Sequence, residues 1–259
     1  MTMPRKQPDT EALKKEAALA GAMFLRERMR GKGPFYVVLG TGSTAGYAFE
    51  HLKRLNIIAT DTSSQTLNAA RKLGIKMLDL EEFKSQSKGQ QVYAIDGADE
   101  IYLDWGERKI HMIKGGGGCH TKERIAGMLA TVYVAVADST KKIEWLGQRS
   151  PLPVEIRRGE DAAAVEDIVG ASEAAGVKIG YPKLRLSGGA AFVTDYAGGN
   201  ILDVPILYRY SVQTLMAFGK SLEAMRNIIS HGLFFDTATA AVIADGNGAR
   251  VFRRGEIWT

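Results

Sequence analysis

The chain has 259 residues, of which 45% are hydrophobic and 24% are charged, and this composition excludes disordered and collagen-like proteins. Its net charge of +5 comes from 34 basic and 29 acidic residues. These charges are mixed along the chain without a basic-aromatic stripe, so we expect no nucleic-acid partner, whereas a mildly positive surface favours small anionic substrates.

Membrane insertion, secretion and metal binding are not expected either. The longest apolar runs, such as residues 131–137, are far shorter than the roughly 20 residues of a membrane-spanning helix. The polar start of the chain lacks the apolar centre of a secretory signal, and Cys119 is the only cysteine, so we expect a cytoplasmic protein without disulfides. The histidines show no metal-ligand spacing and predict no metal site; they are His51, His111, His120 and His231.

The first half of the chain predicts alternating helices and strands. A helix is expected from Thr10 to Arg30, where apolar residues recur at helical intervals before two glycines. Short apolar runs then alternate with helical patterns, and because these runs are continuous they predict a parallel sheet covered by helices on both faces. The predicted strands are 35–39, 56–59, 92–95, 110–113 and 132–136, and the predicted helices between them are 45–55, 63–74 and 122–130.

From Pro151 the pattern becomes that of a smaller antiparallel α+β unit laid against the first. Its predicted order is βαββα, with a strand at 152–156, a helix at 160–175, strands at 183–187 and 199–207, and a helix at 211–229. The last residues contain two apolar runs around the turn Asp245–Gly248, and we expect them to return to the first domain.

Four polar clusters follow predicted strands, at the position where open parallel sheets bind ligands. The first, Gly40–Ala45, opens a helix and offers free N–H groups, the positive end of a helix dipole and several hydroxyls to an anion. The same residues match the dinucleotide fingerprint G-x-G-x-x-A, and Asp61 stands about where a ribose-binding acid would fall. Alone, this loop leaves open a dinucleotide site, a phosphate site and a structural turn.

The second and third clusters combine carboxylates with glycines. Asp96–Glu100 holds three carboxylates, which form either a solvated turn or a group that orients sugar hydroxyls and moves protons. Lys114 is followed by four glycines, Gly115–Gly118, which suit a backbone that curls around a ligand and directs N–H groups at developing negative charge. Glu123 lies nine residues after the lysine and could act as a base, or could be an exposed glutamate favoured by the helix dipole.

The fourth cluster, Asp138–Lys141, is either a helix cap with a solvated lysine or one more polar strand end on the same rim. The neighbouring Cys119 and His120 are not expected to form a nucleophile–base pair, because adjacent residues seldom bring their side chains into hydrogen-bond contact.

In this order, the clusters resemble the ribose-5-phosphate isomerase A family. The most diagnostic feature is the combination of DGADE with KGGGG and a glutamate nine residues after the lysine. The matching segments are LGTGSTA (39–45), TSSQT (62–66), IDGADEI (95–101), KGGGGCHTKERI (114–125), ADSTK (137–141), PLPVEI (151–156) and VTDYAGGNILD (193–203).

The resemblance implies an α/β fold with a doubly wound, mostly parallel, Rossmann-like sheet and a second, smaller ferredoxin-like α+β domain. The expected division is a catalytic domain of residues 1–146 and 230–259 and a small domain of residues 147–229 involved in oligomerisation. It also implies a homodimer or homotetramer that interconverts ribose 5-phosphate and ribulose 5-phosphate in the non-oxidative pentose phosphate pathway, without metal or coenzyme.

The resemblance further implies a set of site residues. The catalytic base would be Glu123, with Asp96, Asp99 and Lys114 as the other catalytic polar groups. The substrate-binding residues would be Thr41, Gly42, Ser43, Thr44, Gly115, Gly116, Gly117, Gly118, Lys141 and Lys14. In this scheme Glu123 moves a proton from C2 to C1 through a cis-enediolate, and either Asp96 or Asp99 shuttles hydroxyl protons.

Three departures from the family pattern lie in loops or the second domain. Cys119 and His120 stand where small apolar residues are usual, Asp195–Asn200 is longer than the usual turn, and Arg157-Arg158 replaces a common proline. The rival hypotheses are a NAD-dependent oxidoreductase that uses Gly40–Ala45, a non-catalytic sugar-phosphate sensor, and a CoA-transferase-like use of Glu123 as a nucleophile.

Overall fold

A seven-stranded sheet, called here the large sheet, organises the computed structural model, which describes residues 9–258. Its strand order is β17-β16-β7-β4-β1-β2-β3, and only β17 runs antiparallel to its neighbour. The order reverses between β1 and β4, which is the switch point where doubly wound sheets bind ligands. The strands are β1 (Phe35–Leu39), β2 (Ile57–Asp61), β3 (Lys76–Met77), β4 (Val92–Asp96), β7 (Val132–Asp138), β16 (Ala240–Asp245) and β17 (Gly248–Arg253).

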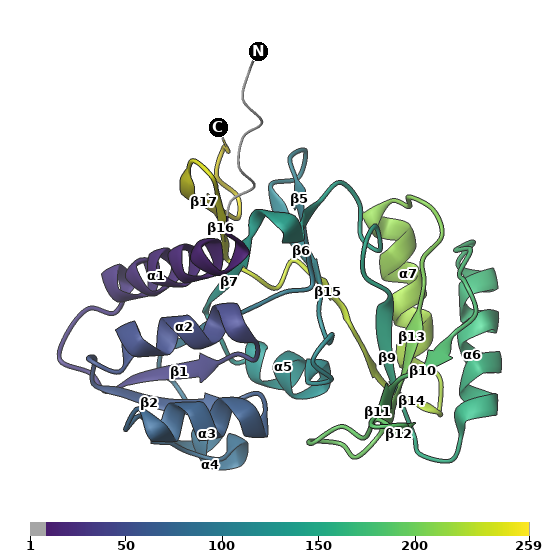
Figure 1. Ribbon diagram of the computed structural model, residues 1–259, viewed down its shortest axis with the longest axis horizontal. Coiled ribbons are helices and arrows are strands. Elements are labelled where there is room, and N and C mark those ends of the chain that lie inside the picture. The colour runs from purple at the N-terminus through teal and green to yellow at the C-terminus, as the bar shows by residue number, and fades with distance from the viewer. Residues whose placement is uncertain (1–8, 259) are drawn as a thin grey trace.

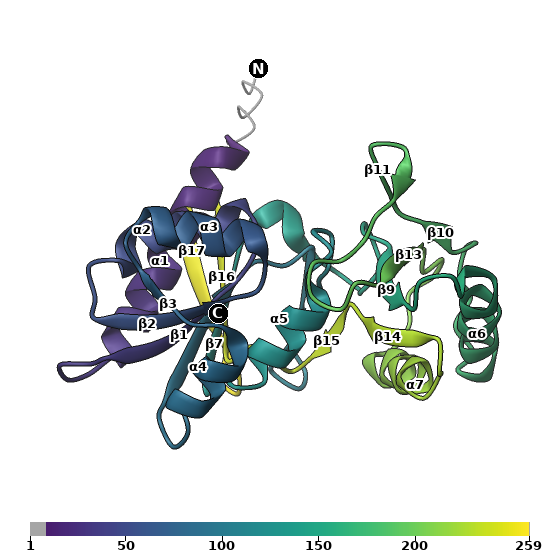
Figure 2. The same cartoon turned by 90° about the horizontal axis from the view of Figure 1, so that it is seen from below.

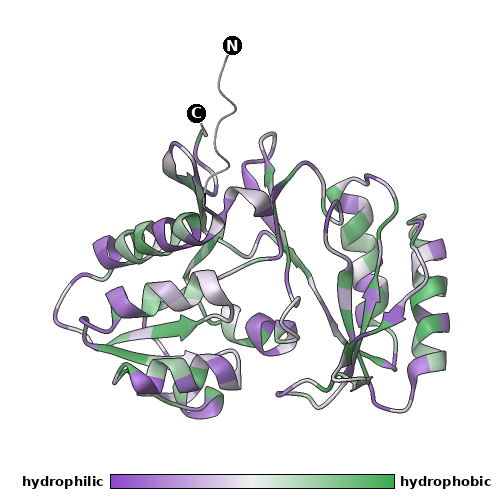
Figure 3. Cartoon of the chain, in the orientation of Figure 1, coloured by the Kyte–Doolittle hydropathy of each residue, from purple (hydrophilic) through white to green (hydrophobic). Residues whose placement is uncertain are grey.

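Helices cover both faces of the large sheet, as the continuous apolar strands predicted (Figures 1 and 2). Successive side chains of a strand point to opposite faces. Val37 and Leu39 of β1 therefore pack in one core with α1, α2 and α3, whereas Val38 packs in a second core with α4 and α5. Figure 3 shows hydrophobic residues along strands of the large sheet and a mixture of hydrophobic and hydrophilic residues along the helices that cover it. The helices are α1 (Thr10–Arg28), α2 (Ser43–Leu52), α3 (Ser64–Lys72), α4 (Leu80–Gln86) and α5 (His120–Gly127).

The predicted strand 110–113 does not belong to the parallel sheet, which is a correction to the sequence analysis. It lies in a separate four-stranded sheet of order β15-β6-β5-β8, and it pairs antiparallel with both β5 and β15. The reason is the short turn before it, where Asp104 accepts the N–H groups of Gly106 and Glu107 and reverses the chain into a hairpin. The strands are β5 (Glu100–Asp104), β6 (Lys109–Ile113), β8 (Lys142–Ile143) and β15 (Leu233–Phe235).

The small sheet has the order β10-β13-β9-β14, and its elements follow one another as βαββαβ. This is the ferredoxin-like arrangement. The predicted helix 211–229 ends at Glu223, because the chain turns there and residues 228–231 add a fourth strand beside β9. The elements are β9 (Leu152–Ile156), α6 (Asp161–Ala174), β10 (Lys183–Leu184), β13 (Asn200–Val204), α7 (Val212–Glu223) and β14 (Ile228–His231), with a hairpin of β11 (Leu186–Ser187) and β12 (Ala190–Ala191).

The end of the chain returns to the large sheet as predicted. Strands β16 and β17 form a hairpin around the turn that begins at Asp245, and β16 pairs parallel with β7. Within residues 9–258, no helix combines the length and apolar character needed to cross a membrane.

Candidate active site

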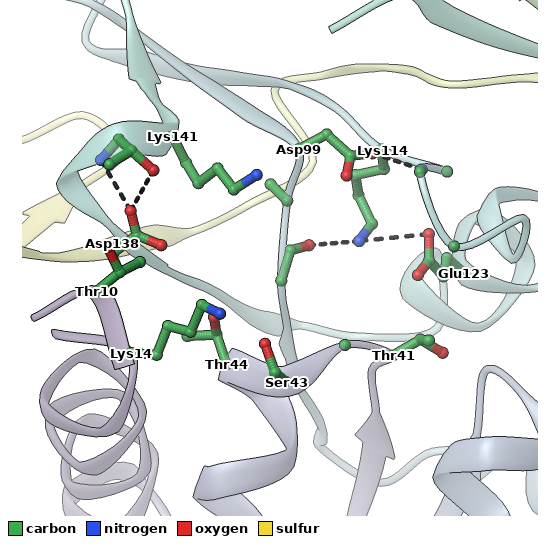
Figure 4. A pocket seen from close by; sticks show the side chains of 17 residues that line it. Thr10, Lys14, Thr41, Ser43, Thr44, Asp99, Lys114, Glu123, Asp138 and Lys141 are labelled. Atoms are coloured by element: carbon green, nitrogen blue, oxygen red, sulfur yellow. Dashed lines mark hydrogen bonds and ion pairs between the residues drawn. The ribbon is translucent and has the colours of Figure 1, made fainter. Parts of the chain in front are cut away.

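A cavity of about 330 Å³ opens where β1, β4 and β7 end, next to the switch point of the large sheet (Figure 4). The first, second and fourth polar clusters meet there from the ends of large-sheet strands. The third cluster, which begins at Lys114, follows β6 of the antiparallel sheet. The predicted site residues that line the cavity are Lys14, Thr41, Gly42, Ser43, Thr44, Asp99, Lys114, Gly115, Gly116, Gly117, Glu123 and Lys141. Asp96 and Gly118 do not line it.

One end of the cavity is suited to an anion. Gly42 precedes α2 with a positive φ of 108°, a conformation that glycine adopts without strain, and so directs the first N–H groups of α2 outward. Ser43 and Thr44 lie at that helix start, and the ammonium groups of Lys14 and Lys141 approach from two other elements (Figure 4). Lys14 also pairs with Glu11 one turn away on α1, at 3.3 Å.

The hydroxyl of Thr41 forms hydrogen bonds within the protein. Its Oγ1 lies 2.8 Å from the hydroxyls of both Thr62 and Ser63 and 3.3 Å from that of Thr66. These bonds tie the loop after β1 to the start of α3. Thr41 therefore supplies lining and backbone to the cavity, while its hydroxyl is used to hold the loop.

Glu123 is the carboxylate at the other end of the cavity. Its residue is only 5% exposed, and Oε2 has no hydrogen-bond partner among residues 9–258. The ammonium of Lys114 lies 3.4 Å from that oxygen. Burial raises the pKa of Glu123 to about 8; Lys114 acts in the opposite direction, and the carboxylates of Asp96 and Asp99 add to the rise. A buried carboxyl with such a pKa is well suited to take and return a proton near neutral pH.

Lys114 is held as a buried cation beneath the cavity. Its Nζ donates to the carbonyl of Gly97 and lies 2.9 Å from Asp96 Oδ2. Burial alone would lower the pKa of Lys114, but the charges of Asp96 and Glu123 outweigh it and raise that pKa well above its usual value. Lys114 is therefore a permanent positive charge at the carboxylate end of the cavity.

Asp96 lies behind the cavity wall, 2% exposed. It accepts a hydrogen bond from the hydroxyl of Tyr133 at 3.0 Å and from the N–H of Gly97 at 2.8 Å, besides pairing with Lys114. Burial raises the pKa of Asp96 above its usual value, while Lys114 opposes the rise. In this geometry Asp96 fixes the position of the Lys114 ammonium through their ion pair. Tyr133 lies inside an apolar strand, so no sequence signal could have singled it out.

Asp99 is the acid of the second cluster that reaches the cavity. Its Oδ2 accepts the N–H of Gly116 at 2.6 Å. A Cβ at position 116 would lie 2.9 Å from Asp99 Cγ, so this contact requires glycine there. The third acid, Glu100, is fully buried and accepts N–H groups from Gly147, Arg149 and Ser150, so it shapes the loop that follows Lys141 and does not face the cavity.

Five lining residues are not among the predicted site residues: Thr10, Gly97, Ala98, Asp138 and Thr140. All of them except Thr10 belong to polar clusters that the sequence analysis identified. Asp138 is 1% exposed, and its Oδ1 accepts the N–H and the hydroxyl of Thr140, which starts the short 3-10 turn Ser139–Lys141. The polar strand end at Asp138 was a usable signal, whereas the approach of Thr10 from the start of α1 was not.

The residues that would serve a dinucleotide site or a cysteine nucleophile are engaged or uncharged in the structure. Asp61, the candidate ribose-binding acid, forms a buried ion pair with Lys122. Burial raises the pKa of Cys119 to about 11 and lowers that of His120 to about 3, so the pair carries neither a thiolate nor an imidazolium at neutral pH. Within residues 9–258, no group of three or more His, Cys, Asp or Glu side chains is placed to hold a metal ion.

Fold and cavity together define an α/β enzyme that binds a small anionic substrate at the switch point of a doubly wound sheet. A family model described as ribose 5-phosphate isomerase A (phosphoriboisomerase A) matches residues 58–248. The ribose-5-phosphate isomerase A of Brucella suis biovar 1 is 33% identical over 258 residues, which cover 95% of this chain and 99% of that protein. The chain belongs to the ribose-5-phosphate isomerase A family.

Solved structures agree with this assignment. The ribose 5 phosphate isomerase A of Neisseria gonorrhoeae superposes with a TM-score of 0.78 at 26% identity, covering 97% of this chain and all of that one (100%). A D-ribose-5-phosphate isomerase solved in complex with phospho-erythronic acid has a TM-score of 0.79 at 24% identity, covering 95% and 100% of the two chains, and shows the same fold.

Proposed function

We propose that this chain interconverts D-ribose 5-phosphate and D-ribulose 5-phosphate, the aldose–ketose isomerisation of the non-oxidative pentose phosphate pathway. The observation that carries the proposal is the placement of Glu123. Its carboxylate is buried beside the ammonium of Lys114 and the glycine loop, and a helix start suited to an anion forms the other end of the same cavity.

The proton transfer would be performed by Glu123. Its carboxylate takes the proton from C2 of the open-chain aldose, the electron pair of that C–H bond forms the C1–C2 double bond of a cis-enediolate, and the π pair of the C1 carbonyl moves onto O1. The carboxyl then returns the proton to C1, while O2 gives up its hydroxyl proton to become the carbonyl oxygen and O1 takes up a proton to become a hydroxyl. General-base catalysis of this kind contributes roughly 10²- to 10⁴-fold.

The negative charge of the enediolate needs fixed donors close to O1 and O2. Lys114 is the buried cation next to Glu123, and Gly115–Gly117 present backbone to the same space. Between Asp96 and Asp99, we assign the transfer of hydroxyl protons, and assistance to ring opening, to Asp99. Support comes from the cavity lining, which includes Asp99 but not Asp96.

The phosphate would bind at the start of α2. Ser43, Thr44 and the first N–H groups of the helix offer donors, and Lys14 and Lys141 supply two positive charges. Binding energy from this end holds the reacting carbons against Glu123.

We further propose a catalytic domain of residues 1–146 and 230–259, of which 1–8 and 259 lie outside the described residues, and a small domain of residues 147–229 that takes part in a homodimer or homotetramer in the cytoplasm. The limit at residue 229 falls within β14, which pairs with β9. Large apolar side chains exposed on the small domain support a protein partner: Tyr181, Leu186, Leu207, Tyr208 and Met216. Sedimentation velocity should give the mass of two or four chains, and a monomer at assay concentration would contradict the proposal.

The proposed activity is tested by incubating purified protein with ribose 5-phosphate in the presence of EDTA and measuring ribulose 5-phosphate. We expect the ketose to form without added metal or coenzyme. A folded protein that binds inorganic phosphate yet forms no ketose would support the sugar-phosphate sensor instead, and calorimetric binding of NAD would support the oxidoreductase.

A further inference from the structure

The glycine loop Gly115–Gly118 has one side toward the cavity and one side packed against the small sheet. Gly115, Gly116 and Gly117 line the cavity. On the other side, the Nη1 of Arg185 donates to the carbonyl of Gly115 at 2.8 Å and to that of Gly116 at 3.0 Å. Phe192 fills the space beside Gly118, where an added Cβ would lie 2.5 Å from the ring atom Cζ and would overlap the ring. A residue of the small sheet region thus holds two carbonyls of the loop.

Arg185 is itself fixed in place. It lies between β10 and β11, and its backbone N–H donates to Ile201 at 2.8 Å. Its Nε donates to Asp203 Oδ2 at 2.9 Å, and its Nη2 pairs with the other oxygen of that carboxylate. The side chain is 16% exposed. A two-point guanidinium–carboxylate pair of this kind fixes the orientation of the guanidinium as well as its position.

Because Arg185 fixes the carbonyls of Gly115 and Gly116, the geometry of the peptide bond also fixes the directions of the N–H groups that follow them. In a trans peptide, the carbonyl of one residue and the N–H of the next point in opposite directions, and the peptide bonds of the loop are trans. Gly115 O points to Arg185, and the N–H of Gly116 accordingly points away, to Asp99 Oδ2. Gly116 O also points to Arg185, which directs the N–H of Gly117 away from the small sheet.

The N–H of Gly117 is available to a ligand. It has no acceptor in the part of the chain that the structure describes, and Gly117 lines the cavity that Glu123 and Lys114 share. A guanidinium on the carbonyl oxygen of the same peptide also draws electron density from the nitrogen, which strengthens that N–H as a donor.

We infer that Arg185 is a positioning residue, which holds the glycine loop so that the N–H of Gly117 meets the oxygen that becomes negative in the enediolate. This inference rests on the proposed isomerase function. Arg185 contacts no reacting atom and acts through the peptide. Its loss should therefore lower kcat by about 10- to 100-fold, as for a misaligned oxyanion donor, and should leave phosphate binding unchanged.

The test compares wild type with Arg185→Met, Arg185→Lys and, as a matched control, Arg158→Met, which changes an exposed arginine in the turn after β9. Phospho-erythronic acid is the probe for the enediolate, because its carboxylate carries negative charge next to the phosphorylated chain; inorganic phosphate is the probe for the anchor. For Arg185→Met we expect kcat to fall by about 10- to 100-fold, KM to change less than about 3-fold, and the Ki of phospho-erythronic acid to rise about as much as kcat falls.

The controls separate positioning from folding. Arg158→Met should behave as wild type, and Arg185→Lys should recover part of kcat, because an ammonium keeps the charge but cannot bond both carbonyls and Asp203 in one plane. If Arg185→Met fails to fold, Arg185→Lys and Asp203→Asn are measured in the same way, with a smaller loss of kcat expected.

Wild-type kcat and Ki in Arg185→Met would overturn the inference, and so would equal weakening of phospho-erythronic acid and inorganic phosphate. Failure of the proposed function is distinct, since in that case wild type itself forms no ketose.

Discussion

At the scale of single residues, the proposed chemistry depends on a carboxylate that is costly to ionise. Glu123 is buried beside two other acids and one lysine, and its pKa is raised to about 8. Burial of this carboxylate therefore lowers stability at neutral pH, and it gives the proposed base a pKa suited to proton transfer. Two measurable consequences follow from the sign of this shift.

The first consequence concerns activity and pH. Glu123 must be ionised to accept the C2 proton, so kcat/KM should rise with pH, by about tenfold per unit well below its pKa, and level off above about pH 8 to 9. Initial rates with ribose 5-phosphate across about pH 6 to 9 give this profile, with circular dichroism confirming that the protein stays folded. A profile that is flat or falls over that range would be inconsistent with Glu123 as the base.

The second consequence concerns stability. Between its unfolded pKa near 4.5 and its folded pKa of about 8, Glu123 binds more protons in the folded state, so its contribution to stability falls as pH rises through that window. Glutamine does not titrate. We expect Glu123→Gln to gain about 2 to 4 kcal/mol in unfolding free energy relative to wild type between about pH 5 and pH 9, at about 1.4 kcal/mol per unit of pKa shift.

Urea unfolding of both proteins at the two pH values measures this difference. Glu173→Gln, at an exposed position of α6, is the control and should show no such pH dependence. The linkage argument fails if the stability difference of Glu123→Gln is the same at both pH values.

At the scale of elements, the site depends on how closely β1 and β4 approach at the switch point. A Cβ on Gly40 would lie 2.5 Å from Asp96 Cα and would overlap its carboxylate. Gly40 follows β1 directly, and its N–H donates to Ile95 of β4 at 2.9 Å. Glycine at this position therefore lets the loop of the proposed anion site lie beside Asp96, which supports Lys114.

Gly40→Ala should displace Asp96 and with it Lys114. We expect a loss of about 1 to 3 kcal/mol of stability from overpacking, together with a fall in kcat. Gly46→Ala in α2 is the matched control, because nothing lies within 4 Å of its added Cβ, and it should gain about 0.5 to 1 kcal/mol from helix propensity. Chemical denaturation and steady-state kinetics on both variants check this pair, and equal effects of the two substitutions would contradict it.

The elements with continuous apolar runs could be predicted from sequence, and those with mixed patterns could not. Phe35–Leu39 and Val132–Asp138 are buried strands preceded and followed by clear breaks. In contrast, Glu100–Asp104 reads as part of an acidic turn, although Ile101 and Leu103 are buried on alternate positions. Residues 228–231 continue the apolar pattern of α7, and only pairing with β9 makes them a strand.

At the scale of the whole molecule, the candidate site combines groups that sequence order can suggest with contacts that only the fold creates. Lys14, Glu123 and Lys141 come from α1, α5 and the turn after β7, yet they line one cavity. The polar strand ends, read with the family resemblance, predicted that meeting. In contrast, the hydrogen bond from Arg185 to Gly115 joins residues that lie about 70 positions apart in the sequence. No local sequence pattern around either residue predicts this contact.

The small sheet region thus does more than extend the surface. Through Arg185 and Phe192 it forms the outer wall of the glycine loop, while the elements around the large sheet provide the proposed anion site and the proposed base. Activity should accordingly require both regions in one folded chain.

The most direct test of the account is the turnover of ribose 5-phosphate by Glu123→Gln, measured beside its affinity for inorganic phosphate. The account predicts that kcat falls by about 10²- to 10⁴-fold while phosphate affinity stays unchanged, because only the proton-transferring oxygen is lost. A variant that forms ribulose 5-phosphate at the wild-type rate would contradict the assignment of the base and the mechanism built on it.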